Sequence, residues 1–181
     1  MSIPLQARSG AWQPALELLE PISLVRCCTS PLGRNLCMIV TETAVHVYVT
    51  SDESPNLSFE PVTSFFLGCR ATGASWSPST QHASTAWRIE ILVATETNEL
   101  RLLESVRQGS EASTSNKKLA DTHVRVSDLA WCASAGYESY AAAACADGTV
   151  RLWDLEGGCR THYLNSPVLS VAFHPKVPKL L

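Results

Sequence analysis

The stretch Ala146-Asp147-Gly148-Thr149-Val150-Arg151-Leu152-Trp153-Asp154-Leu155 decides the fold of this chain. Asp147-Gly148 predicts a tight turn, because glycine adopts positive φ without a steric penalty and aspartate can cap its own backbone. The residues that follow alternate in character, so Val150 and Leu152 should share one face of a strand and Trp153 should lie on the other. The stretch therefore predicts a hairpin whose second strand ends in a Trp-Asp pair.

A hairpin turn that leads into a strand closed by Trp-Asp is the signature of one blade of a WD40 β-propeller. A single blade cannot bury its apolar faces by itself, so blades occur in series. The rest of the chain should therefore contain relatives of this hairpin.

Two other segments repeat the pattern of Thr149–Asp154: residues 99–104 and 44–49. Each has aliphatic side chains at alternate positions with a basic residue between them, and each follows a turn and another apolar strand. Those preceding strands are Leu36–Val40, 89–94 and Tyr140–Cys145. Asn98 occupies the position of Gly148 in its turn, and asparagine is the next-best residue after glycine for a left-handed backbone.

A second element recurs upstream of these hairpins, as a strand that ends in an aromatic residue followed by a small or polar one. The copies are residues 74–78, 129–133 and 171–175, with aromatic residues Trp76, Trp131 and Phe173, and a weaker copy at 25–31. Their separation is close to the about 40–45 residues of a WD40 unit, apart from a longer second unit. The polar stretch 107–118 has no apolar periodicity and predicts a loop that holds the extra length.

The predicted fold class is all-β, an incomplete WD40-type β-propeller. Its blades cover residues 21–67, 68–121 and 122–164, and a fourth begins at 165–181. Residues 1–20 lie outside the repeat, as an arm, a short helix over residues 15–19, or a closing strand for a distant blade.

The number of blades is itself informative, because a propeller needs about four or more blades to close. A partial ring would expose an Ala, Val and Leu face and an unpaired inner strand. We expect a fragment or a truncated gene product. Two copies that associate, or a partner that supplies the missing blades, are the alternatives.

Composition excludes several classes of function. Of the 181 residues, 45% are apolar and 17% are charged, which favours folding over disorder. The net charge of −3 provides no basic field for nucleic acid and no polybasic membrane patch. Aliphatic runs such as Leu36–Val40 are too short to span a bilayer, so we expect neither nucleic-acid binding nor membrane insertion.

The cysteines and histidines predict no metal site. The seven cysteines are odd in number and form no C-x-x-C motif, and the N-terminus does not resemble a secretory signal. We therefore expect a reducing compartment, with all seven cysteines acting as small buried apolar residues. The five histidines are scattered without the i, i+4 spacing of a helical metal site.

Catalytic and cofactor motifs are also missing from the sequence. The G-x-S-x-G elbow of a nucleophilic serine and the two common glycine-rich phosphate loops do not occur. The prediction is a protein that is not an enzyme and that has no cofactor and no small-molecule substrate.

In WD40 blades a histidine before the inner strand, a hydroxyl on the second strand, the turn aspartate and the tryptophan can form a hydrogen-bonded chain. The third blade offers His123, Asp147 and Trp153, but Ala and Cys fill its second strand where the hydroxyl would stand. We expect a partial chain with a structural role, and Trp153 filling the space between adjacent blades. The predicted structural positions are His123, Asp147, Gly148, Trp153, Asp154, Trp76, Trp131 and Phe173.

The third blade and its continuation are more specific than the general repeat. The segments concerned are 153–157, His162, 165–167, 170–171, 173–175 and 179–180, together with 73–78, 90–92 and 100–102 further back. Together they resemble the small WD-repeat nucleoporins of the Y-shaped outer-ring subcomplex, the nucleoporin thirty-seven family, over about residues 68–181. The resemblance implies a scaffold subunit of the nuclear pore at the nuclear envelope, which docks through its propeller on a large outer-ring nucleoporin and supports nucleocytoplasmic transport.

The alternative is a WD40 adaptor of another assembly, such as the substrate receptor of a ubiquitin ligase. That function would need a partner-binding motif such as Asp-x-Arg after the Trp-Asp pair. Leu155-Glu156 follows the pair instead, which disfavours the alternative.

Overall fold

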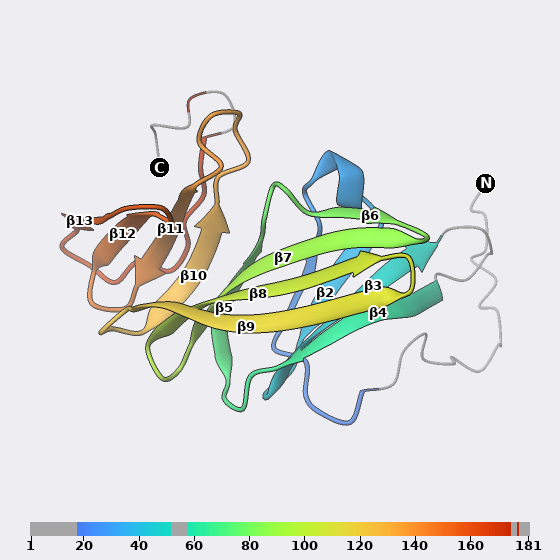
Figure 1. The fold of residues 1–181 in the computed structure, drawn as a ribbon. Helices are drawn as coiled ribbons and strands as arrows, with labels where there is room; N and C mark the ends of the chain where they lie inside the picture. The colour runs from blue at the N-terminus through green and yellow to red at the C-terminus, as the bar shows by residue number, and fades with distance from the viewer. Residues whose placement is uncertain (1–17, 52–57, 175–176, 178–181) are drawn as a thin grey trace, which may run out of the picture.

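A computed structural model describes residues 18–51, 58–174 and 177 of the chain. The described part is built from β-strands, with a single 3-10 turn, η1 (Pro31–Gly33), between the first two. The strands form three antiparallel sheets that follow one another along the chain (Figure 1).

Each sheet is an antiparallel meander in which successive strands pair with each other, with one exception in the second sheet. The first contains β1 (Leu24–Cys27), β2 (Leu36–Val40), β3 (Ala44–Ser51) and β4 (Ser58–Phe66). The second contains β5 (Ala71–Trp76), β7 (Ala86–Thr95), β8 (Glu99–Gln108) and β9 (Glu111–Asp121), with β6 (Gln81–Ala83) paired to β7, so that β5 pairs with β7 rather than with β6. The third contains β10 (Val126–Trp131), β11 (Tyr140–Cys145), β12 (Thr149–Asp154) and β13 (Cys159–Tyr163).

Three antiparallel meanders of four strands in series, the second with the additional strand β6 on its β7, are the blades of a WD40-type β-propeller, so the predicted fold class is confirmed. The strands β2, β11 and β12 have the predicted bounds. The hairpin turns are also as predicted, since Gly148 has φ +84° and Asn98 has φ +60°. The described residues form three blades of a ring and do not close it.

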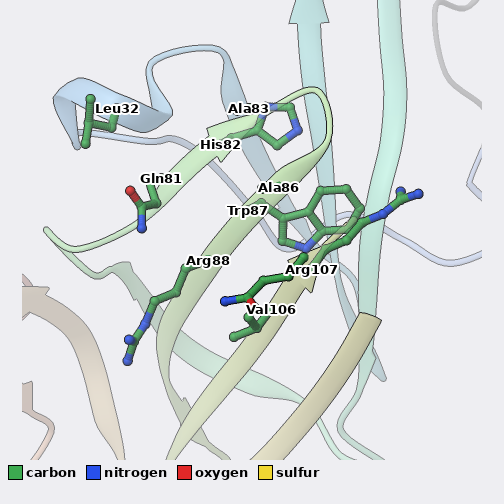
Figure 2. Close-up of a pocket in the computed structure, with 10 residues that line it drawn as sticks. Leu32, Gln81, His82, Ala83, Ala86, Trp87, Arg88, Val106 and Arg107 are labelled. Carbon is green, nitrogen blue, oxygen red and sulfur yellow. The ribbon is translucent and has the colours of Figure 1, made fainter. Parts of the chain in front are cut away.

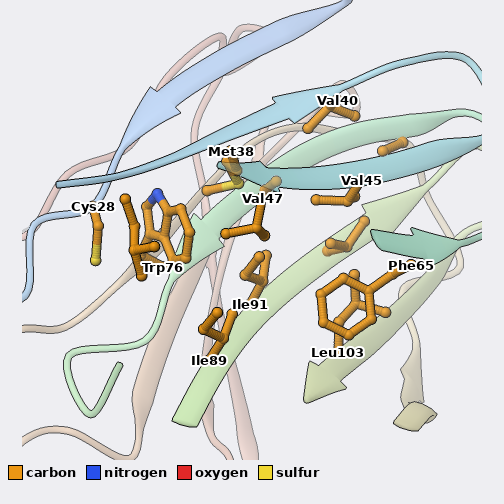
Figure 3. Close-up of a cluster of buried hydrophobic side chains, with 14 of the residues drawn as sticks. Cys28, Met38, Val40, Val45, Val47, Phe65, Trp76, Ile89, Ile91 and Leu103 are labelled. Carbon is orange, nitrogen blue, oxygen red and sulfur yellow. The ribbon is translucent and has the colours of Figure 1, made fainter. Parts of the chain in front are cut away.

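Apolar side chains fill the spaces between consecutive blades. One cluster joins the first blade, through residues such as Met38 and Val47, to Trp76, Ile91 and other residues of the second (Figure 3). A second cluster joins Leu92 and Leu100 of the second blade to the third. Because β-strands alternate their side chains, each blade has one face for each neighbour.

The predicted loop at residues 107–118 is wrong, because β8 extends to Gln108 and the chain then turns back as β9. The strand β9 is the outer edge of its sheet, and residues 111–118 are exposed on both faces. Such a strand has no buried face, so its sequence shows no apolar alternation. Its polar and charged composition, including two lysines, is typical of a protected edge.

The expectation that all seven cysteines are buried is also wrong. Cys27 and Cys159 are exposed and Cys69 is half-buried, while the other four are buried. Cys159 lies on the outer strand β13, whose five residues are all exposed. Cys27 alternates with its buried neighbour Cys28, so only one of these two adjacent thiols lies inside.

No strand is assigned over residues 165–174, which follow the third blade. This segment lies beside β11, since the backbone N–H of Val168 donates to the carbonyl of Cys145 over 3.2 Å. The alanines of β11 are fully buried, so they do not form the exposed face expected of a partial ring; large apolar side chains that are exposed at this end include Tyr163, Leu164 and Leu169.

At the other end of the chain, the helix considered for residues 15–19 falls mostly outside the described residues. Within the part that the structure describes, Glu20 accepts hydrogen bonds from the backbone N–H (3.0 Å) and the hydroxyl (2.6 Å) of Thr43. No helix among the described residues is long and apolar enough to cross a membrane.

Candidate functional site

The first strands of the three blades lie close together and are connected by polar contacts. The indole Nε1–H of Trp76 on β5 donates to the carbonyl oxygen of Arg26 on β1 over 3.1 Å. On the other side of β5, the backbone N–H of Trp131 on β10 donates to the hydroxyl of Ser75 over 2.9 Å. Two of the predicted aromatic positions therefore join consecutive blades.

The same strands carry an ion pair between the first and third blades. Arg26 Nη2 lies 2.5 Å from Asp128 Oδ1. The other carboxylate oxygen of Asp128 accepts bonds from the hydroxyl of Ser170 (2.7 Å) and the backbone N–H of Val171 (3.2 Å). Partial burial acts to raise the pKa of Asp128, but these hydrogen bonds and the charge of Arg26 outweigh it and lower the pKa below its usual value. Asp128 is thus held as a carboxylate.

A cavity of about 230 Å³ opens where these strands converge. Arg26, Arg70 and Arg125 contribute to its wall, with Asp128 as the acidic residue among the lining side chains. Since Asp128 is already paired with Arg26, the cavity has a net positive charge. Its position beside three inner strands corresponds to the central channel of a propeller.

A larger hollow of about 440 Å³ lies on the second blade, around Trp87 (Figure 2). The ring of His82 stacks on Trp87 with centroids 5.9 Å apart, and the guanidinium carbon of Arg107 lies 4.9 Å from the indole centroid. The indole N–H donates to the Ser105 hydroxyl over 3.1 Å. Burial lowers the pKa of His82, which favours the neutral ring in this stack.

The composition of this hollow suits contact with another protein. Leu32 of η1 forms part of its wall and is 67% exposed, although it is a large apolar side chain. Tryptophan and arginine are the residue types that most often dominate protein–protein binding energy. The surface around Trp87 is therefore a candidate contact site.

Three of the predicted structural residues surround one cavity of about 400 Å³ between the second and third blades. His123, Trp153 and Asp154 all line it. Trp153 is 7% exposed and packs with Leu92 and Leu100 of the second blade. Arg151 lines the same cavity. Its Nε is buried and has no hydrogen-bond partner, which is true of no other side-chain nitrogen or oxygen among the described residues.

Asp147 and Gly148 lie at the hairpin turn rather than in that cavity. One oxygen of Asp147 accepts from both the backbone N–H (3.0 Å) and the hydroxyl (2.7 Å) of Thr149, and these bonds lower the pKa of Asp147. Among the described residues, His123 makes no hydrogen bond to Asp147 or to Trp153; it is exposed, with φ +57°. Among these described residues the aspartate is bonded within its own turn, to Thr149 two residues away.

The remaining predicted positions have separate roles. Asp154 closes the turn between β12 and β13 by accepting from the backbone N–H of Glu156 over 3.2 Å. Trp131 is half-buried, and its indole N–H donates to the carbonyl of Glu138 over 2.6 Å. Phe173 is half-buried in the segment after the third blade.

The sequence did not identify the surface residues Trp87 and Arg107 or the pair Arg26 and Asp128. Trp87 lies in an extension of β7 that pairs with β6, and neither belongs to the repeat pattern. Arg26 and Asp128 are 102 positions apart, so no local pattern connects them. Of these four residues, only Trp87 could have been noticed in the sequence, because it is a large aromatic residue within a polar segment.

Metal chemistry has no support in the described part of the chain. No group of three or more His, Cys, Asp or Glu side chains there is placed to hold a metal ion.

Comparison with known proteins gives a partial match. No family model matches the chain. Nucleoporin Nup37 of Mus musculus is 30% identical over 122 residues, which are 66% of this chain and 36% of the mouse protein. Nucleoporin Nup37 of Homo sapiens is 29% identical over the same length.

Among solved structures, Chaetomium thermophilum Sqt1 bound to the N-terminus of the ribosomal protein L10 aligns with a TM-score of 0.48 and 15% identity, over 84% of this chain and 52% of that one. The chain spans about a third of the length of the curated relatives it matches. Across 66% of its own length, this partial WD40-type propeller is thus similar in sequence to nucleoporin Nup37.

Proposed function

We propose that this chain is a non-enzymatic scaffold module of the outer ring of the nuclear pore. In this role its blades dock on a large nucleoporin of the Y-shaped subcomplex at the nuclear envelope and support nucleocytoplasmic transport. The observation that carries the proposal is the 30% identity to nucleoporin Nup37 over 122 residues. Those residues include most of a chain whose described part is built from propeller blades.

The arrangement of the molecule supports a binding role. An aromatic and cationic cluster, around the partly exposed Trp87 and Arg107, lies in a hollow on the surface of the second blade. A rigid β-scaffold with a Trp and Arg surface is suited to holding another protein.

The test is affinity purification of the tagged protein from cells that express the gene at its native locus, followed by mass spectrometry and by imaging of the nuclear rim. We expect outer-ring nucleoporins among the recovered proteins and a signal at the rim. Recovery of ubiquitin-ligase subunits instead, with a diffuse signal, would contradict the proposal and favour the adaptor alternative.

Two variants give matched controls for that experiment. Trp153→Ala removes a buried side chain between blades and should lose all partners because the fold is weakened. Tyr163→Phe changes a side chain that is 83% exposed and should keep them. A Trp153→Ala variant that keeps every partner would indicate that binding does not depend on the folded blades.

A further inference from the structure

Two cysteines lie directly opposite each other on the first two strands. Cys27 on β1 and Cys37 on β2 are register partners in an antiparallel pair. The backbone N–H of the next residue, Cys28, donates to the carbonyl of Leu36 over 2.8 Å, which makes that neighbouring pair the hydrogen-bonded one. Cys27 and Cys37 therefore occupy a non-hydrogen-bonded position, where Cα atoms are about 4.5 Å apart and side chains are closest.

That separation is within the range of about 4.4–6.8 Å that a disulfide requires. The two side chains also point to the same face, because directly opposed residues of a sheet do so. This face is the one away from the core between the first two blades, since Met38, the next residue on β2, belongs to that core. A bond between the two sulfur atoms would therefore not disturb the interblade packing.

The two thiols differ in access. Cys27 is exposed, whereas Cys37 is 4% exposed and packs with Ile39 and Tyr48. Burial raises the pKa of Cys37 to about 11, and the charge of Cys27 and a hydrogen bond between the two thiols add to this effect. Cys37 thus stays protonated while Cys27 faces solvent, so an incoming reagent meets Cys27 first.

We propose that Cys27 and Cys37 form an oxidisable thiol pair that closes to a cross-strand disulfide on reaction with a small disulfide such as oxidised glutathione. The Cys27 thiolate attacks one sulfur of oxidised glutathione, forms a mixed disulfide and releases one glutathione thiolate. Cys37 then gives up its proton, attacks the Cys27 sulfur and releases the second glutathione. The protein loses two hydrogen atoms, and oxidised glutathione is reduced to two thiols.

Oxidation would also restrain a part of the chain that belongs to a surface site. The segment between the two cysteines contains η1, and Leu32 of η1 lines the hollow around Trp87. A disulfide ties together the two ends of this segment. The inference does not depend on the proposed function, because it rests on strand register and thiol exposure alone.

The reduced full chain is incubated with oxidised glutathione, the free thiols are then alkylated, and a non-reduced tryptic digest is analysed by mass spectrometry. Trypsin cuts after Arg26 and Arg34, so the expected product joins peptide 27–34 to peptide 35–70. Each of these peptides holds two cysteines, so variants identify the pair. Cys27→Ser should abolish the link, whereas Cys28→Ala and Cys69→Ser should keep it.

Two further controls separate the pair from an ordinary exposed thiol. Cys37→Ala should leave Cys27 as a stable mixed disulfide with glutathione. Cys159 is exposed but has Trp153 as its cross-strand partner, so it should carry glutathione and form no internal link. A link that survives Cys27→Ser, links found only between two chains, or wild-type protein that retains glutathione on Cys27 would each overturn the proposal.

Discussion

Arg26 and Asp128 form an ion pair of 2.5 Å although they are 102 positions apart in the sequence. Arg26 is on the first strand of the first blade and Asp128 on the first strand of the third. The carboxylate also binds Ser170 and Val171, so one side chain connects two blades and the segment that follows them. The three blades are therefore joined at their inner strands as well as through the clusters between them.

Replacement of Asp128 by asparagine should lower the free energy of unfolding. The variant loses the charge that Arg26 and two further donors recognise, which costs about 1–3 kcal/mol. The Arg26 side chain is 36% exposed, so solvent screens its attraction to Asp128 and we expect a loss in the lower half of that range. Urea denaturation of Asp128→Asn, Arg26→Gln and the double variant measures the coupling; strictly additive effects would mean that the pair contributes nothing.

Stability should also depend on pH through Asp128. Its pKa is lower in the folded chain than the ordinary value, so the charged form stabilises the fold above about pH 4, the unfolded value. This contribution is lost as the pH falls through the lower folded pKa. The difference in unfolding free energy between wild type and Asp128→Asn should be full at neutral pH and shrink below about pH 4. A difference that stays constant down to acidic pH would contradict this assignment.

Truncation of Trp153 to alanine should destabilise the protein by about 3–5 kcal/mol, as for other buried aromatic side chains. Trp153 is 7% exposed and packs against both the second and third blades, so the change leaves a cavity at their contact. Thermal and urea melts provide the measurement. Tyr163→Ala is the control, and because Tyr163 is 83% exposed it should change stability by about 0.5 kcal/mol or less. Equal melting of the two variants would show that Trp153 is not buried.

Gly148 should tolerate no side chain. Its φ is +84°, and an added Cβ would lie 2.8 Å from the carbonyl oxygen of Leu164. Gly109 is a matched control, because it has φ +62° and nothing within 4 Å of such a Cβ. Gly109→Ala should cost about 1–2 kcal/mol for the left-handed backbone alone, and Gly148→Ala about 1–3 kcal/mol more for the clash. Similar losses of stability in the two variants would remove the contact with Leu164 as the cause.

The hairpins of all three blades could be predicted because their signals are local. Turn residues such as Asn98 and Gly148 mark positive φ, and the strands beside them alternate apolar and polar side chains. The edge strand β9 could not be predicted in this way, because a strand exposed on both faces shows no alternation of apolar and polar residues. The short strand β6 was missed for a related reason, since it pairs only with an extension of β7 outside the repeat.

The candidate sites were much harder to predict from the sequence. His123, Trp153 and Asp154 were expected from the repeat, and they do line one cavity. The partial hydrogen-bonded chain expected among His123, Asp147 and Trp153 is not seen among the described residues, where Asp147 accepts from Thr149 within its own turn. The stack of His82, Trp87 and Arg107 depends on which strand faces meet, and that is fixed only when the sheet has formed.

The sequence by itself determined that this chain folds as antiparallel blades, because the turn residues and the two-residue period of a strand depend only on residues close together in the sequence. The tertiary structure alone decided which distant residues meet: Arg26 with Asp128, Trp76 with the Arg26 backbone, and Cys27 with Cys37. Such contacts depend on strand register and on how one sheet packs against the next. Register within a hairpin depends on its turn and on which face is buried, and contacts between blades depend on the packing of whole faces, which no single stretch of sequence contains.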